Sequence, residues 1–281
     1  MKKISLWFLQ GLAHIPLKGL YILSDFAFLI IYYVVGYRRK VVVENLSTSF
    51  PEKSRKEISK IEKRFYRYLC DQIVETLKLL HISDKTLISR VKVENYEAVN
   101  KALSEGRNAV LLMGHYGNWE WVQEITRYFI PGTYMASIYH PLNDKFWDDV
   151  FIRIRSLWHA RILPMKQAPK SLLNKANQPW VCGFIADAYT WYKHENNCID
   201  FLNHKTWFIY GPEEIGKKVK ADFFYLEMSP QKRGHYIIRF YPIQPENTTE
   251  PFPYTREFWK MFEKDIKEKP AYWLWSHKRW K

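Results

Sequence analysis

The residues whose types and spacing could do chemistry lie in the segment GHYGNWEW, residues 114–121. His115 stands between two glycines directly after an apolar run, and Glu120 follows five positions later. In a continuous helix, residues five apart lie about 140° apart around the axis, on different faces. The two side chains can therefore meet only if His115 lies in a turn before a helix and Glu120 lies in the first turns of that helix.

In that arrangement the pair could act as a general base. The Glu120 carboxylate would hold one ring nitrogen of His115 as N–H, and the other nitrogen would take a proton from a hydroxyl. No Gly-x-Ser-x-Gly elbow is present, and no serine or cysteine adjoins the pair, so the nucleophile would be the substrate's own hydroxyl attacking an acyl donor. Spacing alone leaves two alternatives open. The first is that His115 is only a turn or capping residue. The second is that His115 binds a metal with Glu120 and Asp187, which is less favoured because no second histidine lies at ligand spacing.

The elements that must position this segment alternate between strands and helices. The run NAVLLM, residues 108–113, predicts a buried strand that delivers His115 to the carboxyl edge of a sheet, where open α/β sheets place their sites. Ser54 and Glu57 form a capping-box pattern that begins a helix. The apolar stripe of that helix is expected to be core: Ile58, Ile61, Phe65, Leu69, Ile73 and Leu77.

Further strands and helices follow along the chain. Helices are predicted at 96–103, from about Asn118, and at 146–158, and strands at 91–93, 134–139, 162–163, 180–186, 223–227 and 236–241. The alternation indicates an α/β fold with a mixed central sheet flanked by helices.

The segment LYILSDFAFLIIYYVVGY, residues 20–37, approaches the roughly 20 apolar residues of a membrane span. Arg38, Arg39 and Lys40 follow it, and no small-residue cleavage site is present. We interpret it as a membrane anchor or half-embedded helix with the basic cluster at cytoplasmic lipid headgroups. The alternative is a buried amphipathic helix of a soluble domain.

The composition agrees with a protein at a membrane surface. The chain has 281 residues, a formal net charge of +14, 12 Trp and 19 Tyr. Cationic and amphipathic aromatic side chains both find partners at an anionic membrane interface. Cys70, Cys182 and Cys198 lie far apart without CxxC spacing, which predicts free thiols in a reducing compartment.

Several motifs in order carry a resemblance to a known family. They are Tyr37-Arg38, Asn45-Leu46, Phe50-Pro51, GHYGNWE as a His-x4-acid motif, FIRIRSLWHARILPMK (151–166), FIAD (184–187), FLN (201–203), GPE (211–213) and WLWSHKRWK (273–281). Over nearly the whole chain the sequence resembles the bacterial lipid A biosynthesis acyltransferases, most of all a form found in the Bacteroides group. Two departures stand out: Ala188 to Trp191 replace the usual glutamine and proline after Asp187, and His159 replaces a usual glycine.

The resemblance implies a glycerolipid-acyltransferase-like fold, with a membrane segment at residues 1–45 and an acyltransferase domain at 46–281. His115 would be the general base and Glu120 its orienting partner. Substrate contacts are expected from Asn118, Arg153, Arg155, Lys166 and Asp187, with the two arginines on phosphate or oxyanion. The alternatives are a solvated helix face for the arginines and a cap or arginine partner for Asp187.

The implied reaction uses an acyl chain carried on acyl carrier protein and a lipid A precursor as acceptor, and it needs no metal or organic cofactor. The implied location is the cytoplasmic face of the inner membrane. Two rivals remain: the same chemistry on another membrane amphiphile, such as an aminolipid or lysophospholipid, and a non-catalytic binding protein. Basic residues among tryptophans at 273–281 could bind single-stranded nucleic acid, but no nucleic-acid module motif is present and no such partner is expected.

Overall fold

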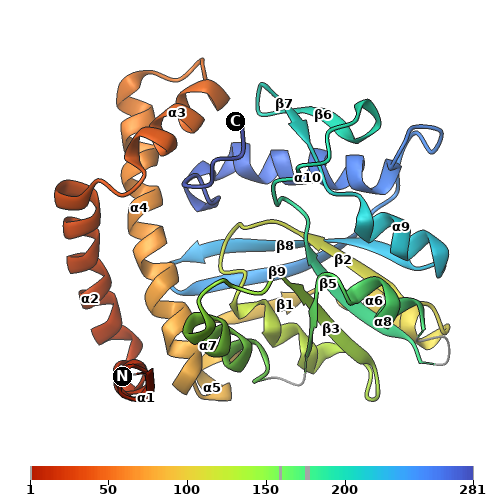
Figure 1. The fold of residues 1–281 in the computed structure, drawn as a ribbon, viewed down its shortest axis with the longest axis horizontal. Coiled ribbons are helices and arrows are strands. Elements are labelled where there is room, and N and C mark those ends of the chain that lie inside the picture. The colour runs from red at the N-terminus through yellow and green to blue at the C-terminus, as the bar shows by residue number, and fades with distance from the viewer. Residues whose placement is uncertain (1, 158–159, 175–177, 281) are drawn as a thin grey trace.

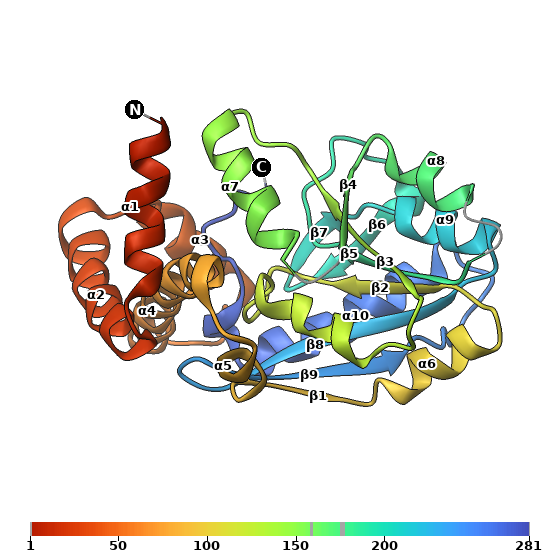
Figure 2. The ribbon, with the colours of Figure 1, turned by 90° about the horizontal axis from the view of Figure 1, so that it is seen from below.

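The computed structural model describes residues 2–157, 160–174 and 178–280 of the chain. Figures 1 and 2 show a central sheet with helices on both faces and an N-terminal helical layer along one side. The N-terminal half contains α1 (Lys2–His14), α2 (Leu17–Leu29), the π-helical η1 (Ile30–Val35), α3 (Arg39–Ser49), α4 (Arg55–Lys78), η2 (Leu79–His81), α5 (Asp84–Ile88), β1 (Val91–Glu94), α6 (Glu97–Ser104), β2 (Ala109–Met113), η3 (Trp121–Tyr128) and β3 (Tyr134–Tyr139).

The C-terminal half continues the alternation of strands and helices. It contains α7 (Lys145–Arg155), β4 (Arg161–Pro164), α8 (Ala168–Leu173), β5 (Trp180–Ile185), η4 (Glu195–Asn197), β6 (Cys198–Phe201), β7 (His204–Trp207), α9 (Gly211–Lys218), β8 (Asp222–Lys232), β9 (His235–Pro242), α10 (Pro253–Glu268) and η5 (Pro270–Tyr272). Every strand predicted from the sequence is found, and the α/β fold class is confirmed. The helix predicted from about Asn118 is instead the 3₁₀ helix η3.

Within the described residues the main sheet has seven strands in the order β1-β9-β8-β2-β5-β3-β4. All neighbours are parallel except β8 and β9, which are antiparallel, so the sheet is mixed as predicted. All five residues of β2 are buried, as expected for a parallel strand covered by helices on both faces. Strand β2 therefore carries its carboxyl end, and the loop after it, beside the carboxyl end of β5.

Helix α4 connects the N-terminal helices to the sheet. Its predicted capping box is confirmed, since Ser54 and Glu57 bond each other's backbone. The predicted apolar stripe is only partly core, because Ile73 is 53% exposed. The buried face instead also carries polar side chains: Glu62, Gln72 and Glu75.

The segment Leu17–Val35 is long and apolar enough to cross a membrane, and it is the one such segment in the described ranges. Only 22% of it is buried, and its outer face exposes Ile22, Phe26 and Val34. Its inner face packs on α4. The segment is therefore neither a fully buried core helix nor fully detached from the sheet domain.

Two residues of the basic cluster after this segment, Arg38 and Arg39, bond to other parts of the chain. Arg39 pairs with the buried Glu62 at 2.6 Å, and Arg38 donates to the Ser276 backbone oxygen at 3.1 Å.

Helix α3 crosses the expected domain boundary at residue 45. The division at 45–46 remains a prediction. Cys70, Cys182 and Cys198 carry free thiols.

Candidate active site

The loop after β2 depends on both of its glycines. A Cβ at Gly114 would lie 2.1 Å from the Phe262 ring. Gly117 has φ +59°, and a Cβ there would lie 2.3 Å from the Met228 backbone oxygen. Larger residues are excluded at both positions by close approach, and at Gly117 also by the left-handed backbone. The tight turn expected before η3 is therefore confirmed.

His115 is paired with Asp187 rather than with Glu120. Its Nδ1 atom lies 2.7 Å from Asp187 Oδ1. Asp187 follows β5 by two residues, and the register of β5 with β2 places Ile185 beside Met113. The acid thus comes from the neighbouring strand, although the two residues are 72 positions apart in the sequence.

Asp187 is held as a carboxylate. It is 1% exposed, and its Oδ2 atom accepts a hydrogen bond from the Trp273 indole at 2.9 Å. Burial alone would raise the pKa of this carboxyl, but His115, Arg279 and the Trp273 bond together outweigh burial and hold it well below its usual range. An ionised Asp187 accepts from Nδ1–H of His115. The Nε2 atom, which has no hydrogen-bond partner in the described parts of the chain, is then left to accept a proton.

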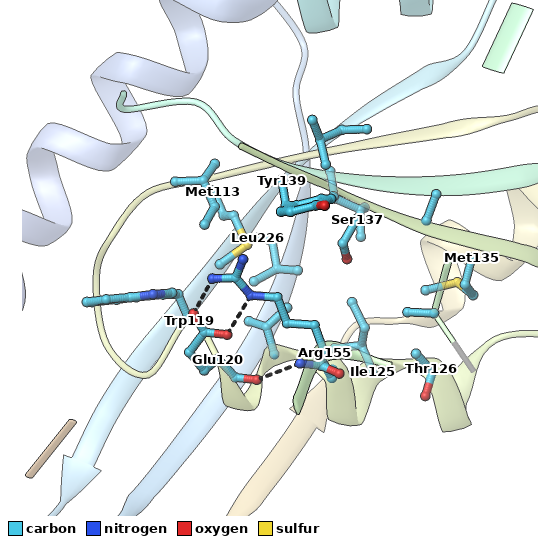
Figure 3. A pocket seen from close by; sticks show the side chains of 18 residues that line it. Met113, Trp119, Glu120, Ile125, Thr126, Met135, Ser137, Tyr139, Arg155 and Leu226 are labelled. Atoms are coloured by element: carbon cyan, nitrogen blue, oxygen red, sulfur yellow. Dashed lines mark hydrogen bonds and ion pairs between the residues drawn. The ribbon is translucent and has the colours of Figure 1, made fainter. Parts of the chain in front are cut away.

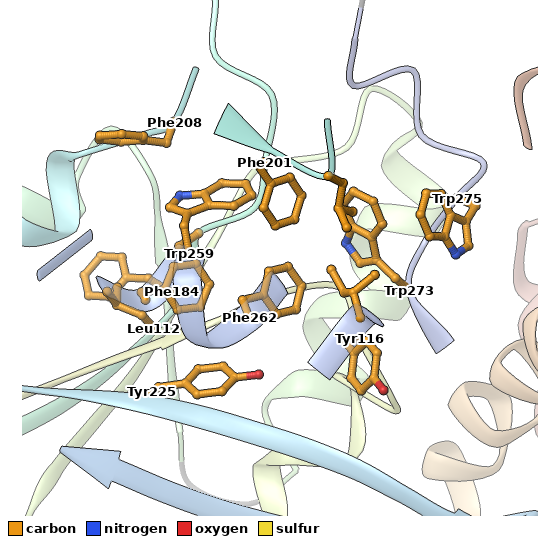
Figure 4. Packing of buried hydrophobic residues seen from close by; sticks show 14 of the residues in the cluster. Leu112, Tyr116, Phe184, Phe201, Phe208, Tyr225, Trp259, Phe262, Trp273 and Trp275 are labelled. Atoms are coloured by element: carbon orange, nitrogen blue, oxygen red, sulfur yellow. The ribbon is translucent and has the colours of Figure 1, made fainter. Parts of the chain in front are cut away.

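The C-terminal segment fixes the backbone of this loop. The Leu274 amide donates to the His115 oxygen at 3.1 Å, and the Gly117 amide donates to the Tyr272 oxygen at 3.1 Å. Tyr116 and Trp273 form an antiparallel bridge. Figure 4 shows both rings in the same aromatic cluster as Phe262 of α10. The loop is therefore clamped by a segment from the end of the chain.

Helix α3 in turn holds this C-terminal segment. The Asn45 side chain donates to the backbone oxygens of Trp275 at 2.9 Å and His277 at 3.0 Å. Motifs that the sequence shows more than 200 positions apart thus meet beside His115.

Glu120 faces the opposite side of the loop and binds Arg155 of α7. Arg155 donates through Nε and Nη2 to the two carboxylate oxygens, at 2.9 and 2.5 Å. Burial would lower the pKa of Arg155, but the bond to Glu120 and its charge raise it. The prediction of a direct contact between Glu120 and His115 is therefore wrong. The half-buried Trp119 ring lies against the His115 ring, at 5.2 Å between ring centroids. Trp119 also lines a cavity together with Glu120.

This cavity is mostly apolar. Its volume is about 70 Å³, and Figure 3 shows the Glu120–Arg155 pair beside the apolar side chains. The apolar lining comes from the sheet strands and from η3: Leu111, Met113, Ile125, Met135, Ile138 and Leu226. A metal site of His115, Glu120 and Asp187 is not assembled, because Glu120 binds Arg155. In the described part of the chain no cluster of three or more metal-ligating side chains occurs.

Asn118 holds the loop from inside. It is fully buried. Its amide donates to Glu75 at 2.6 Å, and its oxygen accepts from Gln72 and from the Trp121 amide. These bonds indicate that Asn118 positions the loop. Its contact with a substrate stays a prediction.

The remaining expected substrate contacts lie at the surface. Arg153 is exposed on α7, and Lys166 is exposed in the turn after β4. Their contact with a substrate stays a prediction. His159, singled out as a departure from the resembling sequences, lies outside the described residues.

Sequence reasoning missed the contribution of α4. Glu75 is fully buried and accepts hydrogen bonds from Tyr21 and Tyr236 as well as Asn118. The Tyr68 hydroxyl also donates to the Gly117 backbone oxygen. One signal could have found this network: polar residues 62, 72 and 75 recur at helical spacing close to the apolar stripe.

The fold and the site define an α/β protein with a histidine–carboxylate pair at the carboxyl edge of its sheet and an apolar cavity one side chain away. The chain belongs to the bacterial lipid A biosynthesis acyltransferase family, which it matches over residues 3–281. A comparison with curated proteins finds no match. The family shows that the chain is an acyltransferase of lipid A biosynthesis, for which a lipid A precursor is the implied substrate.

Proposed function

We propose that this acyltransferase moves a fatty acyl group from an acyl carrier protein thioester to a hydroxyl of a lipid A precursor. The His115–Asp187 pair carries the proposal, because it presents an imidazole nitrogen that can accept a proton beside an apolar cavity. Asp187 takes the orienting role that the sequence suggested for Glu120.

The reaction needs one base and no protein nucleophile. His115 Nε2 takes the proton of the acceptor hydroxyl while the oxygen forms a bond to the thioester carbonyl carbon. The resulting imidazolium is stabilised by the buried carboxylate of Asp187. When the carbon–sulfur bond breaks, the thiolate leaves and takes the proton from His115. The products are the ester and the free carrier thiol.

Glu120 and Arg155 serve this reaction as a second pair. A negative charge develops on the carbonyl oxygen during attack and needs donors placed in advance. The Arg155 side chain is 26% exposed and is held in place by the two hydrogen bonds that it donates to Glu120. In our proposal its remaining N–H groups stabilise the oxyanion, and Glu120 positions them. Both residues therefore contribute to rate, with Glu120 acting through Arg155.

The apolar cavity is the proposed site for the acyl chain. Its lining by methionine, leucine and isoleucine side chains suits a hydrocarbon. The acceptor would enter from the inner membrane, on which the exposed face of Leu17–Val35 rests at the cytoplasmic side. The net charge of +14 favours both an anionic lipid surface and an acidic carrier protein.

The first test is mass spectrometry of total lipid from cells lacking the gene. The cells are complemented with wild type, with His115→Ala, or with Lys218→Ala as an exposed control. Loss of one acyl chain from lipid A, restored by wild type and the control but not by His115→Ala, is expected. A change in another acylated lipid would refute the proposed acceptor. Full restoration by His115→Ala would refute the proposed base.

A second test concerns the donor. Acyl transfer with purified protein is measured from acyl carrier protein and from acyl-CoA at rising salt. Because surface attraction is screened by ions, the carrier protein reaction should be preferred at low salt and lose more rate as salt rises. Equal rates with both donors at low salt would contradict the carrier protein.

A further inference from the structure

The guanidinium of Arg279 is buried against the Trp259 and Trp273 rings, at 5.4 and 5.5 Å from their centroids, but two of its nitrogens lack hydrogen-bond acceptors among the described residues. It is 5% exposed, and its Nε and Nη1 atoms have no hydrogen-bond partner in the described chain. Its acidic neighbour is Asp187, 3.7 Å from Nη2, which is longer than a hydrogen bond. Leaving buried charged donors unpaired is costly. An acceptor from outside the chain would remove that cost.

Arg279 forms a wall shared by two cavities. One is the small cavity that His115 and Asp187 also line. The other, of about 270 Å³, is lined by Lys193, Lys205 and Arg279 together with Thr190 and Trp207. None of its described lining residues is acidic. The larger cavity therefore collects three cationic side chains with no carboxylate of its own.

A second buried polar atom without a partner lies at the same cavity. The Nε2 atom of His204 is buried and has no hydrogen-bond partner in the described residues. Its ring is stacked on Trp280, with 3.9 Å between ring centroids. Both residues that carry these buried, unpartnered atoms thus belong to the lining of one basic cavity.

We propose that this cavity binds a phosphate group of one of the two substrates, an inference that rests on the proposed function. A planar guanidinium and two lysine ammonium groups suit the negatively charged oxygens of a phosphate group, in a monoester or in a diester. The phosphate belongs either to the acceptor head group or to the carrier arm of the donor thioester. Because Arg279 also neighbours Asp187, binding here would fix a substrate one side chain away from the His115–Asp187 pair.

The test measures binding of inorganic phosphate and pyrophosphate to the full chain in detergent by phosphorus NMR titration. The variant is Lys193→Ala/Lys205→Ala, which alters two exposed residues and should leave folding intact. The control, Lys170→Ala/Lys218→Ala, removes the same charge from exposed lysines of α8 and α9 outside the cavity. We expect saturable binding to wild type and control, and binding about tenfold weaker or more in the variant.

A second variant addresses the buried residue. Arg279→Lys keeps the positive charge but loses the planar fork, and it should also weaken phosphate binding in a chain that still unfolds cooperatively. Absence of saturable binding to wild type would overturn the proposal. So would equal binding to the lysine variant and its charge-matched control.

Kinetics identify the source of the phosphate. With Lys193→Ala/Lys205→Ala, a raised KM for the phosphorylated acceptor but not for its dephosphorylated form would assign the head group, whereas a raised KM for the donor would assign the carrier arm. An unchanged KM for both would overturn substrate binding here. Lysine-dependent phosphate binding in a chain that transfers no acyl group would support this site and refute the proposed function. Acyl transfer by a chain that binds no phosphate would support the proposed function and refute this site.

Discussion

Replacing Glu75 by glutamine should change how the stability of the fold depends on pH. Glu75 is fully buried between α2, α4, β9 and the loop after β2, where Tyr21, Tyr236 and Asn118 donate to it. Two effects compete: burial disfavours the charged form, and the three hydrogen bonds favour it. Burial is the larger, and it raises the pKa of Glu75 from 4.5 to about 7.

The sign and the size follow from this pKa. Because the folded chain holds the proton more tightly than the unfolded chain, stability from Glu75 is complete below pH 4.5 and is lost as pH rises through about 7. At about 1.4 kcal/mol per pH unit of pKa difference, the loss amounts to about 3 kcal/mol. Glutamine is never charged, so Glu75→Gln should be free of this loss.

The assay is urea unfolding of detergent-solubilised protein, for wild type and Glu75→Gln, from pH 4.5 to pH 8.5. The free energy of unfolding of the variant minus that of wild type should rise by about 3 kcal/mol across this range. Other buried carboxyls, such as Asp265, whose pKa burial raises to about 6, are present in both proteins and cancel. The control Glu214→Gln, an exposed glutamate on α9, should give a flat difference.

One result would refute this reasoning. If the difference stayed flat, or if wild type became relatively more stable as pH rose, the three hydrogen bonds would outweigh burial. Glu75 would then be an ionised anchor for Asn118, and the balance of effects assigned to this buried site would be reversed.

Three further predictions concern catalysis, the loop and the membrane. Asp187→Asn should lower kcat by about a hundredfold or more with folding retained, because the amide no longer stabilises the imidazolium; steady-state acyl transfer and circular dichroism check this, and a near-normal kcat would contradict it. Gly117→Ala should destabilise the fold by about 2 kcal/mol or more, since φ is +59° and the Cβ would meet Met228; a calorimetric Tm equal to that of wild type would contradict the close approach. Phe26→Ser/Val34→Ser should weaken binding to anionic vesicles in flotation, because both side chains are exposed on α2 and η1; unchanged flotation would remove this face from the membrane contact.

The sheet was predictable from the sequence because its strands are short apolar runs bounded by turns. Residues 134–139 were predicted as a strand with the observed bounds, and the buried run ending at Met113 placed His115 at the correct edge of the sheet. Local patterns of this kind report burial directly. The capping box at Ser54 was predictable for the same reason, since both of its partners lie within one turn.

The partner of His115 was not predictable from spacing. Glu120 is close in sequence, but it lies after the left-handed turn at Gly117 and before a 3₁₀ helix rather than an α-helix, so its side chain leaves on the other side of the loop. Asp187 reaches His115 only because β5 pairs with β2. A contact between neighbouring strands depends on strand order, which periodicity in one sequence does not contain.

The two pairs suggest why one loop carries both a histidine and a glutamate although they do not touch. His115 faces the C-terminal segment and the wall formed by Arg279, while Glu120 faces the apolar cavity and Arg155. Trp119 contributes to both sides, as a ring contact of His115 and as part of the cavity lining. In our proposal the hydroxyl is activated at His115, the acyl chain lies in the cavity, and the two substrates meet beside the Trp119 ring, which contacts His115 and lines the cavity. The five-residue spacing from His115 to Glu120 thus allows one loop to carry two separate pairs, His115 with Asp187 and Glu120 with Arg155. Helix α4 holds this loop through Tyr68 and Asn118.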